Sequence, residues 1–176
     1  MISFSEYQIN NVRLIQQLIK HKVKSIIRLA MIEPGDELRL EFGSLLLETY
    51  SGTRLYIDVD QGRGNILLFD ASNEHTNVSR KVDEFLYKSK IYPENKTYSL
   101  INSFFLHPIC AVDLVSRSDE ASLSFTMCGF RLSFRNGKFL YLGSYLTDLK
   151  LPELCILFPE EVENSLIHQP LTVKSE

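Results

Sequence analysis

The sequence predicts an α+β protein composed of two related halves, each a helix followed by an antiparallel sheet. Three observations lead to this fold class. A residue pattern recurs after about 85 residues, each half begins with an apolar helical stripe, and later segments alternate between apolar and polar residues. The halves are predicted as residues 1–92 and 93–176, either as two units or as one continuous domain. Their boundary lies at Tyr92-Pro93, because a residue before proline avoids the helical region.

The repeat is clearest in two segments that share the pattern Gly-x-x-Leu-Tyr-apolar. They are residues 52–57 and 137–142. At the same offset, residues 27–29 align with residues 112–114. We therefore expect the two Leu-Tyr segments to occupy the same strand position in their own antiparallel sheets. A gap of one residue upstream of them then aligns two glycines, Gly43 and Gly129.

Helices are predicted where apolar residues recur at helical spacing. Residues 5–20 and 98–106 have this spacing, and each segment begins one of the halves. A third helix is predicted at residues 79–87, where Ser79 would cap its first turn. A short helix at residues 160–168 would end before Pro170. Helices therefore make a substantial part of the predicted fold.

Strands are predicted where residues alternate in polarity or are rich in β-branched side chains. Leu132 and Phe134 alternate with polar neighbours, so we expect both to lie in the core. Asn136-Gly137 favours a two-residue hairpin because both residues tolerate positive φ, and Ser51-Gly52 is its counterpart. The predicted strands are residues 25–31, 38–42, 54–59, 66–69, 109–115, 130–134, 139–143 and 154–158.

Composition places the chain among ordered globular proteins. It has 176 residues, of which 44% are hydrophobic and 23% are charged, and its net charge is −3. These values argue against intrinsic disorder and give little support to nucleic-acid binding. The first residues lack the basic and apolar regions of a secretion signal. We therefore expect a cytoplasmic protein that binds neither membranes nor nucleic acids directly.

The sequence contains no motif that fits a catalytic or metal site. Residues 58–65 superficially suggest a calcium loop, but Arg63 stands where that loop needs glycine and Phe69 where it needs glutamate. The four histidines are too far apart in sequence to form a local zinc motif. The Gly-x-Ser-x-Gly sequence is also missing. We expect no catalytic residues, no metal and no cofactor, and hence no enzyme.

A partner-binding surface is predicted near the carboxyl end of the chain. Acidic residues cluster there and would attract a basic partner, although they also suit the first turn of the predicted helix. Two tyrosines on either side of Gly143-Ser144 are candidate anchors, because tyrosine is enriched at protein interfaces. The predicted partner-binding residues are Tyr141, Tyr145, Asp148, Glu160, Glu161 and Glu163.

Residues 129–161 resemble small bacterial immunity proteins of contact-dependent growth-inhibition and related polymorphic toxin systems. The resemblance rests on the Asn136-Gly137 hairpin, the segments 140–143 and 147–149, and the acidic segment that follows. It implies an antitoxin that binds a cognate toxin, expected to be a nuclease, and blocks its active site. Two alternatives stay open: a duplicated small-ligand or regulatory module with a pocket between the halves, and a subunit of a larger assembly that pairs through a sheet edge.

Overall fold

The fold consists mainly of β-strands, so the α+β prediction is wrong. The computed structural model describes residues 13–30, 43–60, 66–73, 85, 87–92, 103–117, 128–146, 152–161 and 166–171. Most of these residues lie in strands. Helical structure in the described chain is confined to residues 13–16 and 103–105 and a 3₁₀ turn, η2 (Pro159–Glu161). The predicted halves of helix plus sheet are therefore replaced by two sheets with short helical turns beside them.

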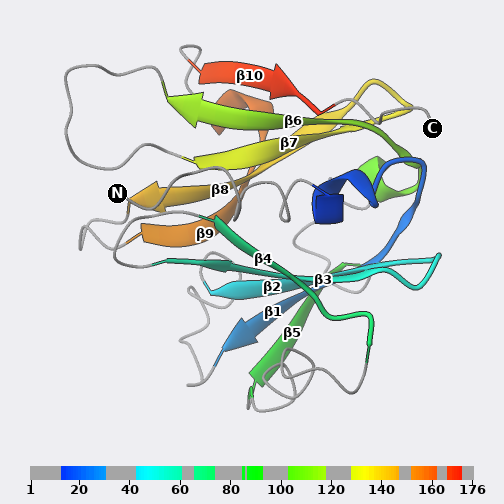
Figure 1. Ribbon diagram of the computed structural model, residues 1–176, viewed down its shortest axis with the longest axis vertical. Coiled ribbons are helices and arrows are strands. Elements are labelled where there is room, and N and C mark those ends of the chain that lie inside the picture. The colour runs from blue at the N-terminus through cyan, green and yellow to red at the C-terminus, as the bar shows by residue number, and fades with distance from the viewer. Residues whose placement is uncertain are drawn as a thin grey trace.

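Each sheet is antiparallel and is built from consecutive strands of the chain. The first contains β1 (Val23–Ala30), β2 (Ser44–Thr49), β3 (Arg54–Val59), β4 (Ile66–Asp70) and β5 (Tyr87–Tyr92), in the order β4-β3-β2-β1-β5. The second contains β6 (Ile109–Arg117), β7 (Cys128–Phe134), β8 (Phe139–Leu146), β9 (Pro152–Leu157) and β10 (Leu166–Pro170), in the order β10-β6-β7-β8-β9. Figure 1 shows the second sheet above the first.

The two sheets repeat one topology and one register. Each is a four-stranded meander whose first strand also pairs with the fifth. Irregular pairing occurs at the same point of β1 and β6, after Val23 and after Ile109. The segments 52–57 and 137–142 occupy equivalent places: Leu55 pairs with Leu47 in the first sheet, and Leu140 pairs with Leu132 in the second. The division at residues 92 and 93 into separate units stays a prediction.

The predicted alignment of the repeat is off by one residue in the first strand. Ile26 and not Ile27 corresponds to Val112, because Ile26 pairs with Leu47 as Val112 pairs with Leu132. From β2 onward the offset returns to 85, so Gly129 corresponds to Ser44 and not to Gly43. The difference falls in the connections between the first two strands of each sheet, which lie outside the described residues.

A single core lies between the sheets. One face of β1, β2 and β3 contributes residues such as Ile26, Leu47 and Ile57, and the second sheet contributes the opposing residues. The helical turns close this core with Leu18 and Phe105. Because alternate residues of a strand point to opposite faces, both layers bury one apolar face against the other. Second-sheet residues of this core are Ile109, Val112, Phe130, Leu132, Phe134, Leu140, Leu142 and Leu154.

A second cluster covers the outer face of the first sheet. It contains Leu29, Leu46, Tyr56 and Ala71, and Phe85 packs against it. Because this cluster buries the outer face as well, β2 lacks the alternating polarity by which strands were predicted from the sequence, and it was not predicted. Its residues Leu45, Leu46 and Leu47 are buried on both faces, so the strand does not alternate in polarity. The strand predicted at residues 38–42 lies outside the described residues.

Two predicted helices are strands at their carboxyl ends. Residues 160–168 were expected to be helical, but Leu166–Pro170 forms β10 and pairs with β6. Residues 79–87 were expected to form a helix, but Tyr87 begins β5, which pairs with β1. In both cases an edge of the sheet supplies backbone partners that local helical spacing does not reveal. Among the described residues of the other predicted helices, 13–16 and 103–105 are helical.

We expect Gly129→Ala to destabilise the fold by about 1–3 kcal/mol. Gly129 faces Gly143 across β7 and β8, and a Cβ at this position would lie 2.8 Å from the Cα of Gly143. The strands would have to separate to admit a methyl group. Urea unfolding measures the loss, and Ser133→Ala on the same strand should stay within about 0.5 kcal/mol of the parent protein. A Gly129→Ala midpoint equal to the parent's would show that the strands are not this close.

Candidate functional site

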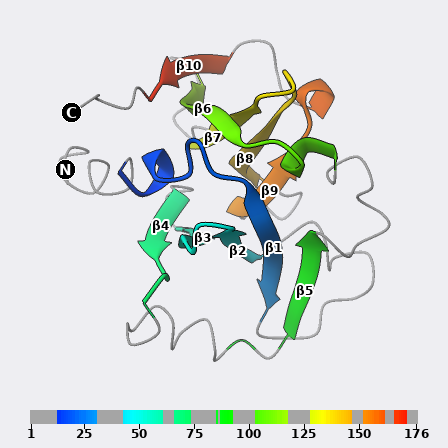
Figure 2. The same cartoon turned by 90° about the vertical axis from the view of Figure 1, so that its right-hand side faces the viewer.

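Both helical turns and both central hairpins meet at one end of the sandwich. We call this the connection end, and define it by residues 13–22, 50–53, 103–108 and 135–138. It lies on the right of Figure 1 and faces the viewer in Figure 2. Each hairpin turn contains a glycine at positive φ, 92° at Gly52 and 80° at Gly137. Hairpins are thus confirmed at Asn136-Gly137 and Ser51-Gly52, but the predicted two-residue loop is wrong. The Phe134 amide donates to the Lys138 carbonyl and the Thr49 amide to the Thr53 carbonyl, so each loop has three residues, of which only the glycine has positive φ.

Backbone hydrogen bonds hold the connection end together. The Tyr50 amide donates to the Lys22 carbonyl at 3.1 Å, and the equivalent Arg135 amide donates to the Pro108 carbonyl at 3.2 Å. The two halves are also joined directly. The Lys20 amide donates to the Ile109 carbonyl at 2.7 Å, and the Ile109 amide donates to the His21 carbonyl at 3.0 Å. This end is therefore a preorganised platform and not a set of independent loops.

A groove of about 310 Å³ opens on this platform. Tyr92, the last residue of β5, forms part of its floor, and the Tyr92 ring centroid lies 4.7 Å from that of Phe105. The pairing of β5 with β1 sets Tyr92 opposite Ile26. Residues from both halves of the chain line the groove, so the groove lies where the two halves meet. The groove-lining residues are Lys22, Tyr50, Tyr92, Phe105 and Leu106.

The rim of the groove exposes large apolar side chains. Tyr50 is 70% exposed and Leu106 is 63% exposed, whereas Tyr92 and Phe105 are buried beneath them. Burial raises the pKa of the Tyr92 hydroxyl, and the nearby Tyr50 adds to the shift. Tyr92 therefore stays protonated and neutral at physiological pH. Chemically, the groove combines an aromatic floor, two exposed apolar side chains and one ammonium group.

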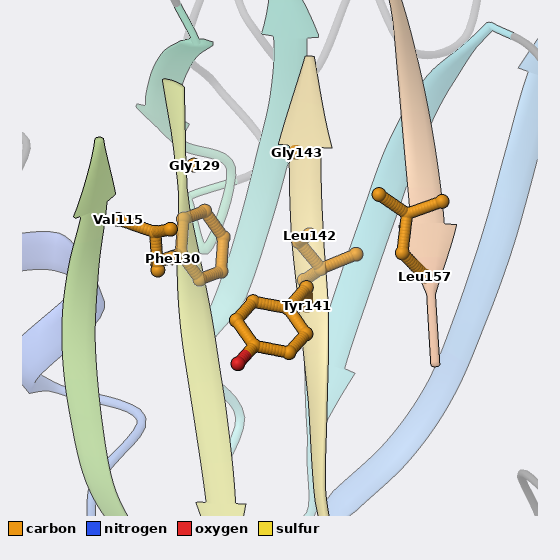
Figure 3. A pocket seen from close by; sticks show the side chains of 7 residues that line it. All are labelled: Val115, Gly129, Phe130, Tyr141, Leu142, Gly143 and Leu157. Atoms are coloured by element: carbon orange, nitrogen blue, oxygen red, sulfur yellow. The ribbon is translucent and has the colours of Figure 1, made fainter. Parts of the chain in front are cut away.

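A second hollow lies on the outer face of the second sheet, beside Tyr141. The Tyr141 ring leans from β8 toward β7 (Figure 3), and Tyr141 lines the hollow together with Gly129 and Gly143. Its centroid is 5.9 Å from that of His168 on β10. The hollow holds only about 10 Å³, which is room for about one water molecule. It is therefore too small to be a ligand site.

The equivalent place in the first sheet is filled by polar side chains. The Tyr56 hydroxyl lies 3.1 Å from Ser44 Oγ and 2.9 Å from Asp58 Oδ2. Burial raises the pKa of Tyr56, so the hydroxyl stays neutral. In the second sheet, glycines stand where the first has Ser44 and Asp58, which leaves the space beside Tyr141. The two sheets share one topology but differ in how the space beside this tyrosine is packed.

The sequence-predicted partner residues do not form one surface in the described structure. Glu160 is exposed in η2, which also includes Glu161 and follows the end of β9. Tyr141 pairs with Leu157 at that end and is only 8% exposed, so it offers little surface to a partner. Tyr145 pairs with Glu153 at the other end of β9. Asp148 and Glu163 lie outside the described residues.

None of the groove residues was among the predicted site residues. The sequence shows a basic segment around Lys22, but a solvated helix face was the favoured interpretation of that segment, ahead of a phosphate- or membrane-binding patch. Tyr50 stands directly before the Ser51-Gly52 turn, and Leu106 directly before His107-Pro108. A large apolar residue at a turn, where polar residues prevail, is the one signal that pointed to this end.

Comparison of the chain with protein families, with curated proteins and with solved structures finds no match. Within the described ranges, no helix has the length and apolar character needed to cross a membrane. The described side chains also contain no group of three or more His, Cys, Asp or Glu residues placed to hold a metal ion.

Proposed function

We propose that the protein is a non-catalytic binding protein that uses the groove at the connection end to bind a partner protein. The observation that carries this proposal is the exposure of Tyr50 and Leu106 beside a preformed apolar groove. Tyrosine is enriched among the residues that dominate binding energy, and such residues cluster around well-packed pockets. The backbone hydrogen bonds of the platform reduce the ordering that binding would otherwise require.

We further propose that the partner is a toxin and that binding neutralises it in the bacterial cytoplasm. This part of the proposal is supported by the resemblance of residues 129–161 to immunity proteins. Neutralisation by direct binding needs a complementary surface and no catalytic group. The acidic segment at Glu160 and Glu161 stays a predicted second contact for a basic toxin, away from the groove.

We expect the double substitution Tyr50→Ala and Leu106→Ala to weaken partner binding at least about tenfold, because it removes both exposed side chains of the rim. The measurement is calorimetry or surface plasmon resonance with the product of the neighbouring gene. Ile167→Ala is the matched control, since Ile167 is 52% exposed but lies on β10. An equal loss of affinity in the control and in the double variant would show that the groove is not part of the interface.

A small-ligand site is the second candidate, because residues from both halves line the groove. Its volume is at the lower end of the range of about 300–1,000 Å³ that small-molecule pockets occupy. A ligand that binds here should raise the melting temperature of the parent protein but not that of a Tyr92→Ala variant. Such a shift, together with no binding to the neighbouring gene product, would favour this function over protein binding.

A further inference from the structure

We propose that the partner segment held by the groove is acidic and carries an apolar anchor, which rests on the proposed protein-binding function. The anchor would be an aliphatic or aromatic side chain seated against Tyr92 and Phe105. One or more carboxylates would lie beside Lys22. The proposal follows from the charge of the connection end and from its apolar groove.

The connection end is basic although the whole chain is acidic. Its four segments contain basic residues and no Asp or Glu, while the chain as a whole has a net charge of −3. The basic residues of the connection end are Arg13, Lys20, Lys22, Arg135 and Lys138, all of them exposed or half-exposed.

These basic groups are not neutralised by the ion pairs seen in the described part of the chain. Those pairs join Arg54 to Glu48 and Arg131 to Asp113, on the strands of the two sheets. Lys138 instead donates to Ser103 Oγ at 2.8 Å and lies 5.1 Å from the centre of the Phe104 ring. Lys22 is exposed and is one of the groove-lining residues. We infer that its ammonium group pairs with a carboxylate next to a bound apolar side chain.

The apolar groove favours an acidic polypeptide over a nucleic acid. A nucleic acid binds mainly through many phosphate contacts, and the net negative charge of the chain opposes a long polyanion. A protein segment needs only one or two carboxylates and gains most of its affinity from the buried anchor. Because exposed charges act over about 8–10 Å in physiological salt, Lys20, Lys22 and Arg135 would contribute steering as well as pairing.

The test uses a short peptide with a Leu-Phe pair between two pairs of glutamates, and a matched peptide with glutamine at the four acidic positions. We expect the acidic peptide to bind the parent protein about fivefold to tenfold more tightly, with the difference shrinking in high salt. Lys22→Gln should remove most of the difference. Lys24→Gln is the control, because Lys24 is exposed on β1 but does not line the groove.

The outcomes separate the acidic preference from the binding function. Equal affinities for the two peptides, both weakened by Tyr50→Ala, would overturn the acidic preference and leave the groove as a protein site. Affinities that Tyr50→Ala leaves unchanged would overturn both proposals. Binding of neither peptide, or tighter binding of a single-stranded DNA than of the acidic peptide, would also overturn this inference. Unfolding midpoints of Lys22→Gln and Lys24→Gln equal to the parent's establish that the variants are folded.

Discussion

Phe134→Ala is expected to lower the free energy of unfolding by about 3–5 kcal/mol, which is the range for removing a buried aromatic ring. Phe134 is 1% exposed in the core between the sheets. Its ring centroid lies 6.1 Å from that of Phe104 and 5.5 Å from that of Phe105, both in edge-on contacts. The substitution would therefore leave a cavity where β7 packs against the second helical turn. Phe105 also lines the groove, so the same packing supports the groove floor.

Urea unfolding of Phe134→Ala and of a control on the same sheet measures this effect. Phe139→Ala is the control, because Phe139 is half-buried on the outer face and lies outside the shared core. It should lose clearly less stability than Phe134→Ala. Leu132→Ala, in the same core, should lose about 2–5 kcal/mol. Similar midpoints for Phe134→Ala and the parent would show that this face of β7 is not buried.

The parts of the fold that the sequence predicted well depend on local chemistry. Residues 130–134 alternate in polarity, and Asn136-Gly137 favours a tight turn, so β7 was predicted with nearly correct bounds and its hairpin at the right place. The loop of that hairpin has three residues, however, and not the predicted two. The strand at residues 54–59 matches β3. The shared Gly-x-x-Leu-Tyr pattern also placed β3 and β8 in equivalent positions.

The parts that were wrong depend on tertiary partners. Leu45, Leu46 and Leu47 do not alternate in polarity, because the cluster that contains Leu46 also buries the outer face of this strand. Phe69 and Phe85 pack against that cluster, and the local sequence does not show these contacts. Leu166–Pro170 is a strand because β6 offers a free edge about 50 residues earlier in the chain. In a short segment, the spacing of apolar residues does not distinguish a helix from a strand that pairs with a distant sheet edge.

The groove could not be predicted for a related reason. Lys22, Tyr50, Tyr92 and Phe105 are spread over more than 80 residues of sequence. They meet because β5 returns to pair with β1, and because the two helical exits share backbone hydrogen bonds. No spacing motif encodes such a meeting. The acidic cluster at Glu160, in contrast, was conspicuous in sequence because its residues are neighbours in the chain.

A buried arginine ties the two sheets together, and its removal should also have a large effect. Arg28 on β1 is 2% exposed and lies between the layers. Its Nη1 donates to the Gly43 carbonyl at 2.6 Å and to the Leu154 carbonyl at 2.9 Å. Leu154 belongs to β9, an edge strand of the second sheet, so a side chain of the first sheet bonds a backbone acceptor of the second. The second sheet has Leu114 at the corresponding position.

We expect Arg28→Ala to lower the free energy of unfolding by about 2–5 kcal/mol, because it leaves buried carbonyls without this donor and opens a cavity. Arg28→Met should lose less, about 1–3 kcal/mol, since methionine refills much of the space and removes the desolvation cost of the charge. Urea unfolding gives both values, and hydrogen exchange should be faster at β9 amides in both variants. If Arg28→Met is as stable as the parent and β9 exchange is unchanged, burying the charge costs as much as its hydrogen bonds contribute. Arg28 would then be dispensable for holding the edge of the second sheet against the first.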